Sequence, residues 1–185
     1  MPIWLIIVLL LLLLFIILFV IASYNSLVKL RNKVKDQFSQ IDVQLKKRSD
    51  LIPNLVETVK GYAKHESETL ENVMKARNTY LSSSSASDKV NASNELSGAL
   101  SKLFALAEAY PELKANTNFE NLQNQLKEVE EKISYARQFY NDSVLMYNNK
   151  VEMFPSNIFA SMFGFKKESF FEADEKEREN VKVSF

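Results

Sequence analysis

The sequence predicts an all-α protein in which an N-terminal transmembrane helix is followed by an antiparallel bundle of long helices. Three observations support this fold class. Residues 3–22 form an uninterrupted apolar run, apolar residues beyond it recur at helical spacing, and no stretch alternates apolar and polar residues as a half-buried strand does. The predicted divisions are a membrane anchor over 1–23, a helical bundle over 24–154 and an aromatic-rich C-terminal segment over 155–185.

The anchor is predicted from length and hydropathy. About 20 apolar residues in a helix cross the roughly 30 Å hydrocarbon core of a bilayer, and the first charged side chain is Lys29. A cleaved signal peptide is the alternative, but no basic residue precedes the run, which exceeds the usual length of about 7–15 residues. We therefore expect the segment to be retained as an anchor. Its marker residues are Ile3, Trp4, Phe15, Phe19 and Ala22.

A cluster of basic residues directly after the apolar run predicts the orientation. The cluster consists of Lys29, Arg31, Lys33 and Lys35. Because cytoplasmic flanks carry an excess of Lys and Arg, we expect the N-terminus outside and the helical domain in the cytoplasm of a single-pass cell-membrane protein. The cluster either only sets topology, which we favour, or also contacts anionic lipid headgroups.

The first helices are placed by apolar stripes and by one proline. A helix continuing from the anchor is expected to end near Asp50, because Pro53 disfavours helical geometry in the residue before it and cannot donate a helix hydrogen bond. A second helix, capped by Asp50 or Asn54, is expected to run as far as Tyr80. Glu66 and Arg77 interrupt its apolar stripe, either as partners of other groups or as residues flanking the seam.

Two further helices complete the predicted bundle. The four serines at 82–85 predict a loop, and a third helix should cover 86–109. A long stripe over 119–154 predicts the fourth helix, with capping side chains from Asn116 onward and a stop at Pro155. Short connections between such helices favour antiparallel neighbours.

The C-terminal segment is unusually aromatic. Together with Phe154, the residue directly before it, it accounts for seven of the thirteen phenylalanines, the others being Phe159, Phe163, Phe165, Phe170, Phe171 and Phe185. A solvated tail does not normally carry so many rings. Either the rings fold back onto the bundle, which we favour, or they dock on a membrane surface or a partner. The charges from Asp174 to Glu179 are read as solvated.

Several stretches of the sequence, spread over about residues 4 to 185, resemble the LemA family of bacterial membrane proteins. The most specific is the run Asp50-Leu51-Ile52-Pro53-Asn54-Leu55-Val56-Glu57-Thr58-Val59-Lys60-Gly61-Tyr62-Ala63, joined by Gln40-Ile41-Asp42-Val43-Gln44-Leu45, Ala107-Glu108-Ala109-Tyr110-Pro111, Tyr140-Asn141 and Tyr147-Asn148. The resemblance implies a single-pass anchor, a long-helix antiparallel bundle and no known catalytic activity. It leaves the biochemical role undefined.

Composition argues against most enzyme chemistry. The chain has no cysteine, one histidine and three glycines, which excludes thiolate metal sites, histidine pairs and Gly-rich phosphate loops. His65-Glu66 is not half of a zinc-protease motif, because position 69 is Thr. A net charge of zero gives no pull toward nucleic acid. We therefore predict no catalytic, cofactor or metal site.

Asparagines inside helical stretches are the remaining candidates. Those predicted to set helix pairing or self-association are Asn25, Asn54, Asn141 and Asn148. A buried Asn in a helical seam fixes register at some cost in stability, and Tyr140-Asn141 and Tyr147-Asn148 are seven residues apart on one helix face. The alternative is that these residues are only partly exposed polar groups.

Three functions remain open at this point. The favoured one is a non-catalytic scaffold or adaptor anchored in the membrane, with membrane lipid, a second copy of the chain or other membrane proteins as partners and no nucleic acid. The second is a membrane-shaping protein whose basic cluster and aromatic tail contact anionic lipid. The third is a module that senses a ligand held between helices.

Overall fold

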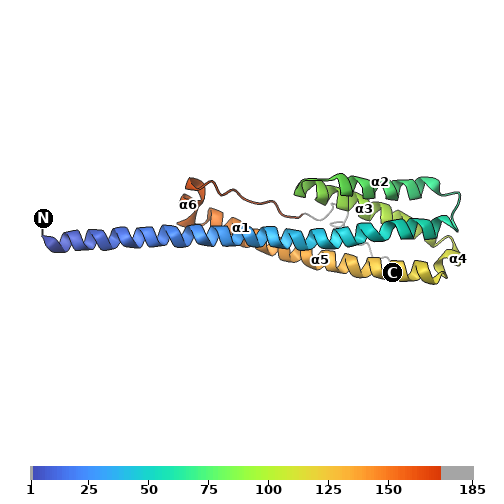
Figure 1. Cartoon of the computed structure of the whole chain (residues 1–185), viewed down its shortest axis with the longest axis horizontal. Helices are drawn as coiled ribbons and strands as arrows, with labels where there is room; N and C mark the ends of the chain where they lie inside the picture. Colours follow the sequence, from blue (N-terminus) through green and yellow to red (C-terminus); the bar gives the residue numbers. More distant parts are fainter. Residues whose placement is uncertain (1, 172–185) are drawn as a thin grey trace, which may run out of the picture. The chain divides into compact units, whose positions relative to one another are not determined.

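The structure, a computed structural model, describes residues 2–171. Over this range the chain is all-α and contains no strand (Figure 1). The helices are α1 (Ile3–Lys60), α2 (Ser67–Ser82), α3 (Ala86–Ala107), α4 (Pro111–Lys114), α5 (Thr117–Glu152) and α6 (Ser156–Met162). The predicted fold class is therefore confirmed: a long apolar N-terminal helix precedes a set of packed helices.

The described residues divide into two compact units. Residues 2–39 and 136–170 form the first, which we call the anchor unit, and residues 40–135 with Phe171 form the second, the bundle unit. Helices α1 and α5 each contribute residues to both units. The boundaries predicted after residues 23 and 154 stay a prediction.

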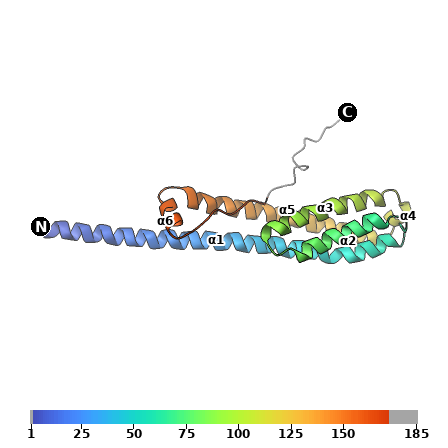
Figure 2. The same cartoon turned by 90° about the horizontal axis from the view of Figure 1, so that it is seen from above.

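The bundle unit consists of four longer helical segments in an antiparallel arrangement and the short helix α4. Figures 1 and 2 show α2 and α3 side by side, with the C-terminal part of α1 and the N-terminal part of α5 completing the layer around the core. The core is mostly aliphatic; Phe119 is its most buried ring, and the partly buried Phe104 and Tyr110 pack against it. Its most enclosed residues are Ile52, Leu55, Val59, Val73, Leu96, Leu103, Leu113 and Phe119.

Helix α1 does not end near Asp50, so that prediction is wrong. The helix continues through Pro53 to Lys60. Proline removes the N–H that would bond the carbonyl four residues earlier, and here that carbonyl belongs to the buried residue Ser49. Arg77 Nε donates a hydrogen bond of 2.8 Å to the Ser49 carbonyl oxygen. A side chain from α2 thus replaces the missing helix bond, which explains why the proline is tolerated.

The helix predicted to run unbroken to Tyr80 is also interrupted. The chain turns between Lys60 and Ser67, and α2 starts only at Ser67. Gly61, which has low helix propensity, lies at the first turn position. Partners far along the chain hold this turn: Asn116 Nδ2 donates to Tyr62 Oη at 2.9 Å, and Tyr110 Oη donates to Glu66 Oε1 at 3.3 Å.

The remaining connections agree closely with the sequence. Helix α2 ends at Ser82 and α3 begins at Ala86, after a serine N-cap in which Ser85 Oγ accepts the Asp88 N–H. Helix α3 ends at Ala107, and a separate short helix, α4, then occupies Pro111–Lys114. Asn116 Oδ1 accepts the Phe119 N–H at 3.0 Å, which confirms the predicted capping at the start of α5.

In the anchor unit, α6 turns back beside α1 (Figure 2). The end of α6 is closed by two hydrogen bonds, from Gly164 N–H to the Ser161 carbonyl and from Phe165 N–H to the Ala160 carbonyl. Gly164 has a φ of 73°, in the left-handed region that a side chain disfavours. This is a Schellman closure, and it directs residues 165–170 back along α5.

Candidate functional site

Nearly all of the apolar run is exposed in the structure. Helix α1 is the one candidate membrane span found in the described residues, and none of its most apolar stretch is buried. Ile3, Trp4, Phe15 and Ala22 are exposed. Phe19 is also exposed, at 37%, but its ring lies 5.8 Å from that of Phe159 in α6. The last part of the run therefore contacts α6.

The basic cluster divides into exposed and occupied members. Lys29, Lys33 and Lys35 are exposed to solvent. The guanidinium of Arg31 instead lies over the Phe165 ring, with Cζ 4.9 Å from the ring centroid, a cation–π arrangement. Three lysines thus remain available for headgroups, while Arg31 helps to hold the C-terminal segment.

The four asparagines lie in different surroundings. Asn25 and Asn54 are exposed, Asn141 is half-buried, and Asn148 is buried. Asn148 Nδ2 donates to the Glu168 carbonyl and Asn148 Oδ1 accepts the Glu168 N–H, both at 2.9 Å. This side chain therefore pairs with an extended backbone segment. The role of these asparagines in helix pairing stays a prediction.

Two tyrosines of α5 extend the same contact with the C-terminal segment. Tyr147 Oη donates to the Lys166 carbonyl and Tyr140 Oη donates to the Ser169 carbonyl, each at 2.9 Å. For both phenols, burial raises the pKa above the ordinary value and the nearby Glu168 carboxylate raises it further. The phenols are therefore neutral donors at physiological pH. We call residues 165–170 and their partners on α5 the C-terminal dock.

Aromatic rings complete the dock from the α1 side. The Tyr24 ring makes edge contacts with Phe163 and Phe165, at centroid distances of 5.0 and 5.7 Å, and Phe38 contacts the Tyr140 ring at 5.8 Å. Such edge contacts are favourable beyond the area that they bury. The first part of the predicted aromatic segment thus folds back onto α1 and α5 within the anchor unit. Phe185 and the charges at 174–179 lie outside the described residues.

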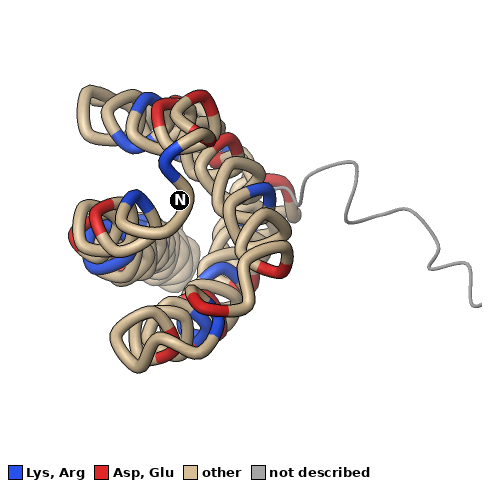
Figure 3. Tube along the Cα trace, turned by 90° about the vertical axis from the view of Figure 1, so that its right-hand side faces the viewer, with Lys and Arg blue, Asp and Glu red and all other residues tan. Residues whose placement is uncertain are grey.

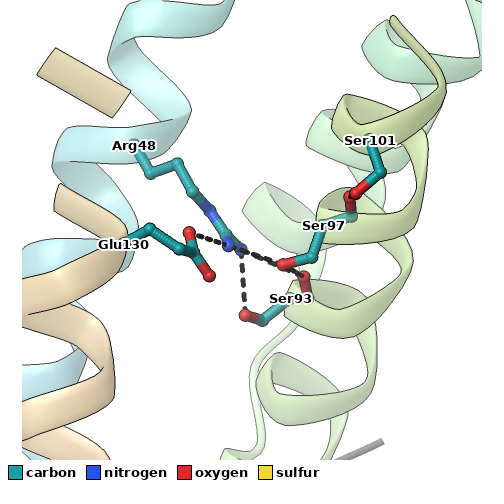
Figure 4. Close-up of polar contacts among 5 residues, drawn as sticks. All are labelled: Arg48, Ser93, Ser97, Ser101 and Glu130. Atoms are coloured by element: carbon teal, nitrogen blue, oxygen red, sulfur yellow. Dashed lines mark hydrogen bonds and ion pairs between the residues drawn. The ribbon is translucent and has the colours of Figure 1, made fainter. Parts of the chain in front are cut away.

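The bundle unit contains a buried arginine that the sequence analysis missed. Arg48 is 1% exposed and projects from α1 between α3 and α5. Its Nη1 donates to Ser97 Oγ at 2.8 Å and to Glu130 Oε2 at 3.0 Å, and its Nη2 donates to the Ser93 carbonyl and hydroxyl at 3.0 and 2.9 Å (Figure 4). One guanidinium therefore ties three helices together.

The sequence carried a signal for this residue. Apolar residues at 41, 45, 52, 55 and 59 follow a heptad-like rhythm, and Arg48 occupies the seam position between 45 and 52. A charged residue at such a position must be paired when buried. The serines and Glu130 could not be inferred, because they come from helices separated from Arg48 by 45 residues or more.

A groove borders the arginine cluster. It has a volume of about 640 Å³, and its lining includes Arg48, Ser101, Phe104, Asn124 and Lys127. The volume is in the range of small-molecule sites. Most N–H donors of the Arg48 guanidinium already bond Ser93, Ser97 and Glu130. The guanidinium therefore stabilises the fold and has few donors left for a ligand in the groove. The ligand-sensing hypothesis stays a prediction.

A second polar link joins α1, α2 and α3. Asp42 Oδ1 accepts hydrogen bonds from Tyr80 Oη at 3.1 Å and from Lys89 Nζ at 2.7 Å. Burial, followed by the Asp42 carboxylate, raises the pKa of Tyr80 well above its ordinary value. This contact is structural, because the phenol is 4% exposed and its hydrogen bond goes to a neighbouring helix.

Basic and acidic residues are mixed along the described helices. Figure 3 shows Lys and Arg interspersed with Asp and Glu along the helices in that view. Among residues 2–171, no group of three or more His, Asp and Glu side chains is placed to hold a metal ion. The single histidine, His65, is exposed in the turn before α2.

Comparison with known proteins gives a family and several distant relatives. The sequence model of the LemA family matches residues 37–185. The chain is 26% identical to protein LemA of Metamycoplasma hominis, over 86% of this chain and 74% of the relative. It is 22% identical to magnetosome protein MamQ 2 of Paramagnetospirillum magneticum and 21% identical to magnetosome protein MamQ of Magnetospirillum gryphiswaldense, over 80% of this chain and 64% of each relative. The chain thus spans less than two thirds of these two magnetosome proteins.

Proposed function

The chain belongs to the LemA family, and on that premise we propose that it is a non-catalytic, membrane-anchored helical scaffold that assembles through α5. The observation that carries the proposal is a row of exposed apolar residues on α5 that the fold does not use. The anchor supplies attachment to the bilayer, and the helices supply the surface that is presented to partners.

Anchoring is supported by residues 3–22 of α1. This run is long enough to cross a bilayer, is uncharged, and has none of its most apolar window buried. The exposed Lys29, Lys33 and Lys35 follow it directly. On the positive-inside rule they favour an N-terminus outside the cell membrane and a helical domain in the cytoplasm.

The exposed row on α5 consists of Phe139, Met146 and Met153, and we call it the α5 stripe. These side chains are 59%, 50% and 62% exposed in the single chain. Successive members are seven residues apart, so they lie along one side of the helix, with Met153 directly after its last turn. A heptad-spaced apolar row is the surface that one helix offers to another. A second copy of the chain presents the same row and is the occupant that we propose.

Oxidative crosslinking of full-length protein in its native membrane tests the proposal. Because the chain has no cysteine, Met146→Cys introduces a single thiol, and we expect a disulfide-linked dimer. Adding Phe139→Glu should abolish the dimer, because a carboxylate would be buried in the apolar contact. Gln138→Glu, at the exposed neighbouring position, adds the same charge off the stripe and should leave the dimer intact.

The possible outcomes separate the alternatives. A Met146→Cys dimer that is lost only with Phe139→Glu supports self-assembly. A photocrosslinker placed at Met146 that captures only a different membrane protein would make the chain an adaptor and would contradict self-assembly. Recovery of monomer alone by both methods would overturn the proposal.

A further inference from the structure

A second exposed apolar surface lies on and beside α6. Phe154, Ile158 and Met162 are 79%, 54% and 62% exposed, and we call them the α6 patch. Ile158 and Met162 are four residues apart and share one side of the helix. The other side is used internally, since Ser156 and Ala160 are buried. Helix α6 therefore packs by one side and presents large apolar side chains on the other.

Contacts within the anchor unit fix the level of α6 along α1. The Phe159 ring lies 5.8 Å from Phe19, which is three residues before Ala22, or about 5 Å inside the end of the apolar run at 1.5 Å per residue. The Phe163 ring lies 5.0 Å from Tyr24, just beyond that end. Helix α6 thus lies at the end of the apolar run, where a spanning helix would pass from hydrocarbon to headgroups.

The backbone of α6 suits that environment. A helix end in a poorly hydrated place needs its polar groups satisfied internally. The closure at Gly164 supplies acceptors for the N–H groups of Gly164 and Phe165, and Phe163 N–H bonds the Phe159 carbonyl. The segment that follows is held by the C-terminal dock. The turn can therefore enter an interface without leaving these groups unpaired.

We propose that α6 is an interfacial membrane element whose α6 patch inserts into the bilayer beside the anchor. The bilayer is favoured as the occupant because the patch is continuous with the candidate span through the Phe19–Phe159 contact. Amphipathic segments at this level bury their apolar side roughly 5–10 Å into the headgroup and acyl boundary. The inference rests on the proposed anchoring of α1, and it adds a second, C-terminal point of membrane contact.

Site-directed fluorescence on the full chain in phosphatidylcholine vesicles tests it. Single cysteines are introduced by Ile158→Cys in the α6 patch, Leu12→Cys within the candidate span and Gln138→Cys on an exposed part of α5. Each is labelled with an environment-sensitive fluorophore. Quenching is measured with lipids that carry a nitroxide high on the acyl chain for position 158, with lipids that carry it near the chain end for position 12, and separately with aqueous iodide.

Gln138 is a suitable distant control because its neighbour Tyr140 contacts Phe38. Phe38 is sixteen residues beyond Ala22, or about 24 Å along the helix. We expect nitroxide lipid to quench position 158 at least about threefold more than position 138, and iodide to show the reverse order. Position 12 should be quenched by the lipid and protected from iodide.

Each outcome gives a distinct answer. Lipid quenching at position 12 without quenching at position 158 would overturn the interfacial role of α6 and leave the anchor proposal standing. If position 158 were instead protected from both quenchers, a protein surface would cover the patch, and the inference would again fail. Absence of lipid quenching at position 12 would overturn anchoring itself, and with it the premise of this inference.

Discussion

In the bundle unit, aliphatic side chains from parts of α1 to α5 fill the interior. In the anchor unit, by contrast, the C-terminal segment is fixed by ring contacts and by hydrogen bonds from α5 side chains to its backbone. Aliphatic burial is non-directional and tolerates small shifts between helices. Side-chain bonds to a backbone are directional and depend on a few atoms. The bundle unit is therefore expected to resist single surface changes, while the dock should be released by one substitution.

The comparison also concerns what each unit leaves exposed. The anchor unit presents the apolar run, the α5 stripe and the α6 patch, although it is the part with the fewest aliphatic core residues. Large exposed apolar surfaces mark contacts with membranes or other proteins. The bundle unit thus holds most of the aliphatic core, and the anchor unit holds the three exposed apolar surfaces named above.

The largest effect is expected from Arg48, the buried charged residue inside the bundle unit. Arg48→Ala removes the guanidinium that joins α1, α3 and α5 and leaves a cavity, so we expect a loss of about 3 kcal/mol in the free energy of unfolding. Urea unfolding of the full chain in detergent micelles, followed by far-UV circular dichroism, measures it. Glu130→Gln should cost less, because that carboxylate is half exposed. An unchanged midpoint for Arg48→Ala would show that the arginine cluster does not hold the bundle.

In the anchor unit, Asn148→Leu should release the C-terminal dock. It removes two hydrogen bonds to Glu168, worth about 1 kcal/mol each, so local opening should become about 2 kcal/mol easier. Hydrogen exchange over residues 165–170, read at amides other than that of Glu168, reports this opening, because the Glu168 amide loses its own acceptor in the variant. Asn149→Leu, at the exposed neighbouring position, is the matched control. Slow exchange preserved in Asn148→Leu would contradict the role of this side chain in the dock.

The proline in α1 offers a test of how the bundle unit compensates a local defect. Arg77→Ala should cost about 1.5 kcal/mol in the free energy of unfolding, because the buried Ser49 carbonyl loses its donor. In a Pro53→Ala background the backbone N–H of residue 53 can serve that carbonyl. The same Arg77→Ala change should then cost clearly less. Equal costs in the two backgrounds would mean that Arg77 acts through some other contact.

Two glycines distinguish the units by the sign of the effect. Gly164→Ala places a side chain at a φ of 73°, and we expect it to destabilise the closure after α6 by about 1 kcal/mol. Gly98 lies inside α3 with open space around it. Gly98→Ala should therefore stabilise the bundle unit by about 0.5–1 kcal/mol. Thermal unfolding and hydrogen exchange of both variants would check these opposite directions.

The smallest effect at neutral pH is expected for Tyr80→Phe, at about 0.5 kcal/mol for its hydrogen bond to Asp42. The pKa of Tyr80 is raised in the folded state, so above about pH 10 the unfolded chain loses the phenolic proton first. Wild-type stability should therefore fall as the pH rises beyond that value, and less steeply in Tyr80→Phe. Unfolding midpoints across an alkaline series measure the two slopes, and parallel slopes would exclude a contribution from Tyr80.

The candidate sites were only partly visible in the sequence. The aromatic segment and the Tyr-Asn pairs of α5 stood out by composition and spacing. The hydrogen bonds between Asn148 and the Glu168 backbone were not predictable, since no sequence motif marks Glu168 as a partner. Arg48 was overlooked although its seam position signalled it. The α6 patch could not be separated from Phe159, because both are apolar residues in one short helix and only packing against α1 tells the inward side from the outward side.

The sequence by itself determined the features that depend on local chemistry. These are the apolar run of 3–22, the serine turn before α3, the cap at Asn116 and the extent of α5, because hydropathy, helical period and capping are properties of neighbouring residues. Tertiary structure alone decided that α1 continues through Pro53, that one arginine joins three helices and that the C-terminal segment folds onto the anchor unit. Each of these outcomes depends on a partner 19 or more residues away, and local sequence does not specify which distant groups will meet.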